Sequence, residues 1–263
     1  MSKSKRKPRG RLLIAKYHTL LKEKEKLKKK GRGELTHEIE QQLEDLGGLD
    51  HYQKLSQRGA QRGSDSSKWV LKQIKQKQLI PPDLTQVPLK LLDVGALQDY
   101  YSKHPEFSSK QIALEAIDLN PQDQKVKKAD FFEFANSLGS FQYDFLVLSL
   151  VLNFVPLPEE RGEMLRLAAS ILKRSSGILF IVLPLACVEN SRYMKHSRFV
   201  KLVQSCGFVL VEQDHSNKLA RYVFRRMSIE QEASHPKIDY RRKTCRYGKG
   251  NFNNFCITTK GSS

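Results

Sequence analysis

The segment Leu89-Lys-Leu-Leu-Asp-Val-Gly95 constrains the fold more than any other part of the chain. Its apolar residues suit a buried strand, and the strand ends at Asp93-Val-Gly95, where the backbone has to turn tightly. A second apolar run, from Ile112 to Leu119, contains Asp118, which lies 23 positions after Gly95. In Rossmann-type folds an acid about 20 residues beyond a glycine turn binds the hydroxyls of a ribose. The spacing therefore predicts an α/β fold that binds the nucleoside part of a cofactor.

The residues around the turn argue against a dinucleotide. Only one glycine stands where a pyrophosphate-binding turn has three, and the carboxylates of Asp93 and Asp99 would repel a diphosphate. An acid before the turn suits a zwitterionic ligand better. We therefore expect S-adenosyl-L-methionine as the cofactor, with Asp93 facing its ammonium group and Asp118 accepting hydrogen bonds from its ribose. The alternative is that Gly95 only turns the chain and Asp118 only ends a strand.

Two later segments extend the expected cofactor site. Lys127 to Phe131 is typical of a short strand or turn that ends in Asp130, about where an S-adenosylmethionine methyltransferase places an acid on the adenine amino group. Tyr143 to Val155 has the continuous apolar character of a central parallel strand that is covered on both faces. The set of expected cofactor contacts is completed by residues at or beside these strand ends, Leu119, Phe131 and Ser149.

The end of the sheet distinguishes between nucleotide-binding folds. Phe208–Val211 and Leu219–Phe224 have the composition of strands, and the seven residues between them are too few for a crossover helix. These strands must therefore pair as an antiparallel hairpin. A Rossmann-like parallel sheet with an antiparallel C-terminal hairpin is the topology of class I methyltransferases. The elements expected before the hairpin are a helix over Pro158–Lys173, a strand over Ile178–Leu183 and a helix over Ser197–Ser205.

Positive charge is concentrated at the two ends of the chain. Residues 1–33 hold 14 basic and 2 acidic side chains, residues 225–263 hold 9 and 3, and the 191 residues between them hold 23 of each sign. Polycationic segments neutralise phosphates and give salt-sensitive affinity for nucleic acid. Lys3 to Arg11 is a compact basic cluster of the nuclear or nucleolar type, and a role as an import signal alone is the alternative for this arm.

The C-terminal segment interleaves its cations with aromatic rings, in Tyr240–Tyr247 and then Asn251–Phe255. Rings among arginines and lysines can stack unpaired bases, so we expect this segment to contact RNA. The alternative is that Phe252, Phe255 and Ile257 fold back onto the core as one more apolar strand.

Four segments follow from these patterns. We expect a basic, disordered arm over residues 1–33, a small helical section over 34–87, a cofactor-binding domain over 88–226 and a basic tail over 227–263. The helical section rests on an apolar stripe at Leu35, Ile39, Leu43 and Leu46 and on a second stripe from Trp69 to Ile80. No C-x-x-C motif and no apolar run of 18 residues occurs, so we expect neither a metal site nor a membrane span.

Several motifs together resemble one family, the fungal 25S rRNA adenine-N1 methyltransferases. The resemblance covers residues 43 to 226, and Ser149-Leu-Val-Leu-Asn-Phe-Val-Pro156 is its most specific part. It implies a substrate adenine in large-subunit ribosomal RNA, pre-ribosomal particles as partners and a location in the nucleus and nucleolus, and we expect a monomer. The other matching motifs are Gly47–Gln53, Ser66–Trp69, Leu92–Leu97, Ile117–Asn120, Asp130–Phe132 and Arg161–Leu165.

The expected chemistry needs no general base, because adenine N1 carries a lone pair at neutral pH. The site has to accept an unpaired adenine and align N1 with the methyl group. Asn153 and Phe154 lie just past the carboxyl end of the fourth strand, where ligands bind in open α/β sheets. We expect Phe154 to stack on the base and Asn153 to hydrogen-bond its edge. Capping of the strand is the alternative role for both.

Two other functions remain compatible with the cofactor site. One is a non-catalytic S-adenosylmethionine sensor that acts through protein partners, as a metazoan relative of the family does in mTOR-pathway signalling. A sensor has no use for polycationic ends, and this disfavours it. The other is a protein methyltransferase, which is disfavoured because the sequence indicates no acidic groove for a basic substrate.

Overall fold

In the computed structural model, the described residues are 31–48, 66–80, 87–108, 111–236, 238–248 and 250–259, with single positions between 13 and 27. The chain forms two compact units, residues 1–65 and residues 66–263. Residues 49–53 of the motif at Gly47–Gln53, and Lys3–Arg11, lie outside the described residues.

The first unit contains a short helical cluster. A 3-10 turn, η1 (Gly33–Thr36), leads into helix α2 (His37–Asp45), and the predicted stripe places Ile39 and Leu43 in its buried face. These two side chains pack against Tyr17 and Leu20, so the described positions of the basic arm contribute apolar surface. Lys24 also pairs with Glu40 at 2.9 Å. Leu35 remains exposed.

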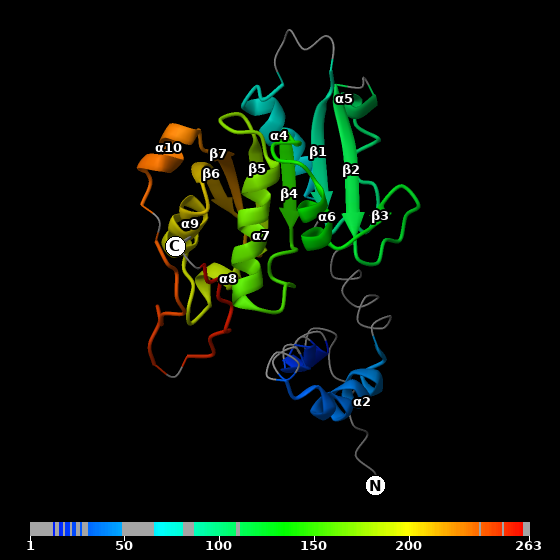
Figure 1. The fold of residues 1–263 in the computed structure, drawn as a ribbon, viewed down its shortest axis with the longest axis vertical. Helices are drawn as coiled ribbons and strands as arrows, with labels where there is room; N and C mark the ends of the chain where they lie inside the picture. The colour runs from blue at the N-terminus through cyan, green and yellow to red at the C-terminus, as the bar shows by residue number, and fades with distance from the viewer. Residues whose placement is uncertain are drawn as a thin grey trace. The chain divides into compact units, whose positions relative to one another are not determined.

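The second unit is built on one seven-stranded sheet in the order β3-β2-β1-β4-β5-β7-β6 (Figure 1). Strands β1 to β5 run parallel, whereas β7 is antiparallel to both β5 and β6. The predicted class I methyltransferase topology and its C-terminal hairpin are therefore confirmed. The strands are β1 (Leu89–Val94), β2 (Ile112–Asp118), β3 (Lys127–Lys128), β4 (Phe145–Ser149), β5 (Ile178–Pro184), β6 (Phe208–His215) and β7 (Leu219–Arg226).

Helices cover both faces of this sheet. Helices α6 (Phe131–Ser137), α7 (Pro158–Ile171) and α9 (His196–Ser205) supply the cluster on one face, and α4 (Ser67–Gln76) packs on the other. The sequence division puts α4 in a separate helical section over residues 34–87, whereas the structure packs it with the sheet, because its apolar stripe is buried against β1, β4 and β5. The shorter helices are α5 (Pro105–Ser108), α8 (Ala186–Glu189) and α10 (Ile229–Ser234).

The C-terminal segment folds back onto this unit. Phe255 and Ile257 are buried in the main core, and isolated bridges join Ser191 to Asn253 and Tyr240 to Thr259. The expectation that the rings of this segment stack on RNA is therefore wrong for Phe255, because a buried ring offers no face to a base. The alternative of folding back holds, although the segment forms bridges rather than a continuous strand.

Candidate functional site

The carboxyl ends of β1, β2 and β4 meet at the point where the strand order reverses, which is where ligands bind in open α/β sheets. Gly95 follows β1 with φ of +77°, a conformation that favours glycine. A Cβ added here would lie 2.5 Å from Cγ2 of Val151 and 4.0 Å from Oδ2 of Asp118. Val151, in the segment after β4, therefore packs directly against the Gly95 turn, and Asp118 at the end of β2 lies beside the same point.

Asp118 ends β2 beside the Gly95 turn. Its Oδ1 accepts a hydrogen bond from the backbone N–H of Asn120 at 2.6 Å. Burial raises the pKa of its carboxyl group above the ordinary value of 3.8, and the bond from Asn120 opposes that rise. The partly desolvated carboxylate gains more than an exposed one would from hydrogen bonds donated by ligand hydroxyls. Gly95 and Asp118 thus fit the ribose and backbone contacts that a nucleoside cofactor requires.

The other residues expected to bind the cofactor lie around the same edge, with different degrees of exposure. Asp93 is buried in β1, one residue before its end, and Ser149 is half-buried at the end of β4. Leu119 is 65% exposed immediately after β2. Asp130 caps helix α6, because its Oδ1 accepts hydrogen bonds from the N–H groups of Phe132 and Glu133.

Phe131 begins helix α6, and its side chain is buried in the core. Because the ring of Phe131 is buried in the core, only its backbone is left to contact a cofactor. Asp130 retains a second carboxylate oxygen beside it, since both cap bonds use Oδ1. Their roles toward the adenine of the cofactor stay predictions.

The chain leaves β4 through a strained turn. Leu150 has φ of +58°, which is unusual for a residue with a branched side chain and costs on the order of 1–3 kcal/mol. Its N–H bonds the carbonyl of Val182 in β5, so the turn is held in place. The turn leads to Asn153, whose Oδ1 is buried without a hydrogen-bond partner among the described residues, and to Phe154, which is 37% exposed.

A buried arginine fixes the residues that follow. Arg161, in the first turns of α7, is 1% exposed and donates hydrogen bonds from Nε to the carbonyl of Val155 at 2.8 Å and from Nη1 to that of Cys256 at 2.6 Å. Nη2 reaches the carbonyl of Pro156 at 3.4 Å, and the guanidinium lies 4.8 Å from the ring centre of Phe255. Burial lowers the pKa of this guanidinium. One cation thus joins the Asn153–Pro156 loop to the C-terminal segment.

Gly162, the next residue, permits this contact. A Cβ at this position would lie 2.0 Å from the carbonyl oxygen of Thr258, and the N–H of Thr258 bonds the carbonyl of Pro158 at 3.0 Å. The role of Arg161 has one signal in the sequence. By helical spacing, Arg161 lies on the same face of α7 as Leu165, Ala168 and Leu172, and this face is buried.

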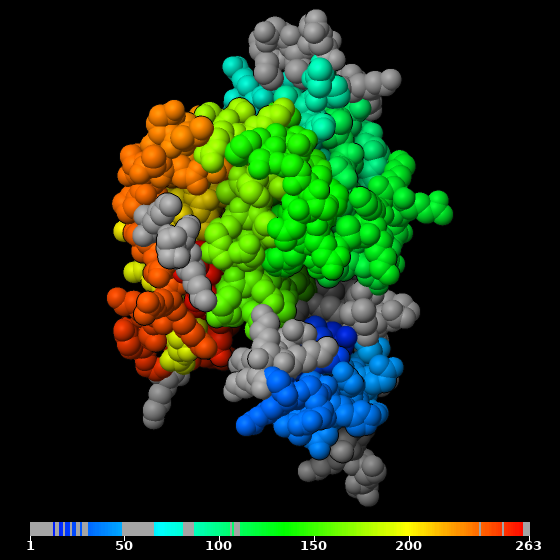
Figure 2. Space-filling model, viewed as in Figure 1, coloured from blue at the N-terminus to red at the C-terminus, as the bar shows by residue number. Residues whose placement is uncertain are grey.

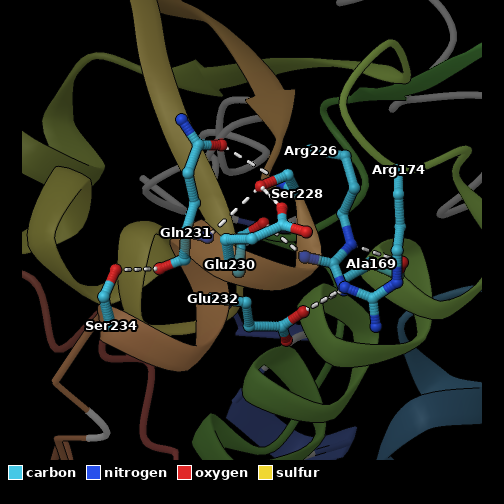
Figure 3. A network of polar contacts seen from close by, with 9 residues as sticks. Ala169, Arg174, Arg226, Ser228, Glu230, Gln231, Glu232 and Ser234 are labelled. Atoms are coloured by element: carbon cyan, nitrogen blue, oxygen red, sulfur yellow. Dashed lines mark hydrogen bonds and ion pairs between the residues drawn. The ribbon is translucent and has the colours of Figure 1, made fainter.

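A separate hollow of about 350 Å³ lies near the carboxyl end of β7, between α7, α9 and α10. Because β7 is antiparallel to β5, this is the edge of the sheet opposite to the carboxyl ends of β1, β2 and β4. Figure 3 shows two of its arginines, Arg174 and Arg226, engaged within the protein. Arg226 donates to the carbonyls of Ala169 and Gly207 and to Glu232, and Arg174 pairs with the same carboxylate. Because these donors are used, we assign the hollow a structural role.

The described part of the chain holds neither a cluster of metal ligands nor a helix that could span a membrane. Among these residues there is no group of three or more histidine, cysteine or acidic side chains placed to hold a metal ion. No described helix combines the length and apolar character needed to cross a membrane.

Comparison with known proteins identifies the family. Residues 37–257 match the family described as 25S rRNA (adenine(2142)-N(1))-methyltransferase, Bmt2. The chain belongs to this family. A curated relative from Schizosaccharomyces pombe, the 25S rRNA adenine-N(1) methyltransferase, is 32% identical over 95% of this chain and 91% of its own length. The predicted family, the methyltransferase class and the S-adenosyl-L-methionine cofactor are thereby confirmed.

A second family member, the 25S rRNA (adenine(2142)-N(1))-methyltransferase of Saccharomyces cerevisiae, is 32% identical over 84% of this chain, which spans 62% of that relative. Similarity to solved structures is more distant. A putative sarcosine dimethylglycine methyltransferase from Galdieria sulphuraria is 14% identical, with a TM-score of 0.47 over 62% of this chain and 84% of its own. An S-adenosylmethionine-dependent methyltransferase from Clostridium acetobutylicum is 10% identical, with a TM-score of 0.45 over 67% and 99%.

Proposed function

We propose that this protein transfers the methyl group of S-adenosyl-L-methionine to N1 of an adenine in 25S ribosomal RNA during ribosome biogenesis in the nucleus. Membership of the family supports the reaction and the RNA class. The proposal includes a nucleolar location, action on pre-ribosomal particles and a monomeric enzyme. Because the family description specifies adenine 2142, the corresponding adenine is the first target to test.

The cofactor is assigned to the carboxyl edge of β1 and β2. Gly95 brings the backbone close to the ligand, and Asp118 accepts hydrogen bonds from the ribose hydroxyls. Asp93 faces the ammonium group, while Asp130 and the backbone of Phe131 contact the adenine ring. Ser149 and Leu119 complete the walls. When bound, S-adenosyl-L-methionine supplies an electrophilic methyl group.

The base is assigned to the loop after β4. The observation that carries this assignment is the buried Oδ1 of Asn153, which has no hydrogen-bond partner in the described part of the chain. A buried acceptor without a donor is costly, so an incoming N–H group gains more than it would from an exposed acceptor. The exocyclic amine of adenine is such a donor, and it lies beside N1 on the same edge of the base. Entry of the base requires the side chains of Asn153 and Phe154 to rearrange, because Oδ1 of Asn153 is already buried in the protein without RNA.

This placement discriminates between purines. Guanine presents a carbonyl oxygen where adenine has the amine, so Asn153 Oδ1 would face a second acceptor. Phe154 supplies a face on which the unpaired base can stack, which is worth about 1–3 kcal/mol per base. Neither residue has to remove a proton before transfer, because N1 of adenine is already unprotonated at neutral pH.

The decisive experiment measures methyl transfer from radiolabelled cofactor to large-subunit RNA that lacks this modification. The wild-type protein is expected to label the RNA at N1 of one adenine, located by mass spectrometry of nuclease fragments. Asn153→Ala and Phe154→Ala are expected to bind cofactor normally by calorimetry and to lose at least about tenfold in transfer. A wild-type protein that binds cofactor but labels no ribosomal RNA would instead support the sensor function.

A further inference from the structure

Two segments that are far apart in the sequence form one layer beyond the carboxyl end of β5. Residues 186–198 follow β5, and residues 240–248 and 250–253 lie across them; we call these segments together the docked layer. The N–H of Cys245 bonds the carbonyl of Arg192 at 2.8 Å, and the N–H of Arg192 bonds the carbonyl of Asn253 at 2.9 Å. In Figure 1 this C-terminal loop, coloured orange to red, lies toward the end of the sheet to which the arrows of β1, β2 and β4 point.

Half-buried arginines hold the layer in place. Arg246 donates to three backbone carbonyls of residues 186–198, at 2.7 Å to Ser191, 2.6 Å to Met194 and 3.0 Å to Val188. Arg198 in turn donates to the carbonyl of Arg241 at 2.7 Å. The layer is therefore held by defined hydrogen bonds rather than by chain proximity alone.

The exposed charges of the layer are mostly cationic, although the segment after β5 also carries the exposed carboxylate of Glu189. Residues 240–253 contain five basic side chains and no acidic one. Lys195, Arg241, Arg242 and Lys243 are exposed, and within the described residues none of these four forms an ion pair with a carboxylate. Figure 2 shows the orange and red surface of the C-terminal segment beside the green surface of α7.

Aromatic rings accompany these charges. The guanidinium of Arg242 lies 4.1 Å from the ring centre of Tyr193, and this stacking orients the cation. Tyr247 is 79% exposed, which leaves a ring without a protein surface to cover it. Cations beside an exposed ring match a single nucleic-acid strand, which offers both phosphates and unstacked bases.

The layer also borders the loop assigned to the base. Strands β4 and β5 are parallel neighbours, with Ser149 opposite Val182, so the segments that follow them leave the sheet side by side. Phe255, just beyond the layer, accepts a hydrogen bond at its carbonyl from Ser191 at 2.5 Å, and its ring contacts Arg161. Arg161 holds the loop of Asn153 and Phe154 through the carbonyl of Val155.

We propose that the docked layer binds the sugar-phosphate backbone of unpaired ribosomal RNA on one side of the target adenine, with Tyr247 stacking on a flanking base. The proposal rests on the proposed function, since it names where the substrate of that reaction continues beyond the site. The layer thus supplies affinity for the strand, while the loop after β4 selects the base. An acidic protein segment would match the charges but not the exposed ring.

The test uses the full chain and a single-stranded RNA fragment that contains the target adenine. The triple variant Arg241→Gln, Arg242→Gln, Lys243→Gln is compared with the wild type by fluorescence anisotropy over a salt series. The slope of log K against log salt is expected to fall in magnitude by about 2, at roughly 0.7 for each of three lost phosphate contacts, and Kd to rise at least about tenfold. The affinity for S-adenosyl-L-methionine and kcat at saturating RNA are expected to stay within about twofold, whereas KM for RNA rises.

A matched control removes the same charge elsewhere. Lys72→Gln, Lys75→Gln, Lys90→Gln changes three exposed lysines of α4 and β1 and is expected to leave the salt slope unchanged. Tyr247→Ala is expected to weaken binding roughly 5- to 150-fold with no change in slope, because stacking releases no counterions.

Three results would overturn the proposal. The first is an unchanged salt slope in the triple variant, and the second is an equal reduction of the salt slope in the lysine control. The third is displacement of the bound RNA fragment by polyglutamate as effectively as by unlabelled RNA of equal charge. Because binding is read separately from transfer, a wild-type protein that binds the strand but methylates nothing would refute the proposed function and leave the docked layer standing.

Discussion

Replacement of Arg161 by methionine tests how the base loop is held. Methionine fills a similar volume, but it removes the two short hydrogen bonds to the carbonyls of Val155 and Cys256. A hydrogen bond to a charged group contributes about 1.5–3 kcal/mol, so the loss amounts to about 3–6 kcal/mol. Release of a desolvated cation offsets part of this loss, and we expect about 3 kcal/mol of net destabilisation.

The effect on transfer should exceed the effect on cofactor binding. In a folded unit of this size, 3 kcal/mol lowers Tm by about 6–12 °C, which calorimetry can measure. Gly95 and Asp118 do not depend on Arg161, so cofactor affinity at 20 °C should change by less than about twofold. The loop of Asn153 and Phe154 loses its anchor, and a displacement of about 1 Å in a reacting group can reduce the rate about 100-fold.

The same substitution five residues along α7 provides the control. Arg166 pairs with Glu163 at 2.5 Å on the helix surface, where both side chains are more than a third exposed. Arg166→Met should therefore cost less than about 1 kcal/mol and leave transfer unchanged. Our account of Arg161 fails if Arg161→Met lowers Tm but transfers methyl at the wild-type rate while folded, or if cofactor affinity and rate fall in parallel.

Three further predictions concern the cofactor site. Gly95→Ala places a Cβ 2.5 Å from Val151 at a φ of +77°, so cofactor affinity should fall at least tenfold by calorimetry, about 1.4 kcal/mol, while the circular dichroism spectrum is kept; undiminished affinity would move the cofactor elsewhere. Asp118→Ala should weaken cofactor binding by about 1.5–3 kcal/mol for each lost charged hydrogen bond, and a loss below threefold would exclude Asp118 as the ribose acceptor. Because burial raises the pKa of Asp118, protonation should weaken cofactor binding as pH falls, starting at a higher pH than for an ordinary aspartate, and this acid limb should be absent from titrations of Asp118→Asn.

The sheet could be predicted from the sequence because its strands carry local signals. Continuous apolar runs define β4 and β5, and the short connection between β6 and β7 leaves only an antiparallel pairing. Gly95 and Asp118 could be predicted for the same reason, since a turn and a strand end are encoded in the residues around them.

The contacts between distant segments could not be predicted in this way. Nothing local marks Cys256 as the partner of Arg161, and the basic composition of the C-terminal segment suggested an exposed tail although Phe255 and Ile257 are buried. The position of Arg161 on the apolar face of α7 indicates that its N–H groups need acceptors inside the protein. Which carbonyls serve as acceptors depends on the tertiary structure.

The contact between Arg161 and Cys256 also bears on the order of folding. It closes a loop of 95 residues, whereas β1 and β2, which carry the cofactor contacts, pair over a much shorter stretch. Closure of a longer loop costs more chain entropy, so long-range contacts are favoured to form after local ones. A chain that has assembled its cofactor site can therefore still lack an ordered base loop, and correct assembly of the enzyme is better monitored by methyl transfer than by cofactor binding.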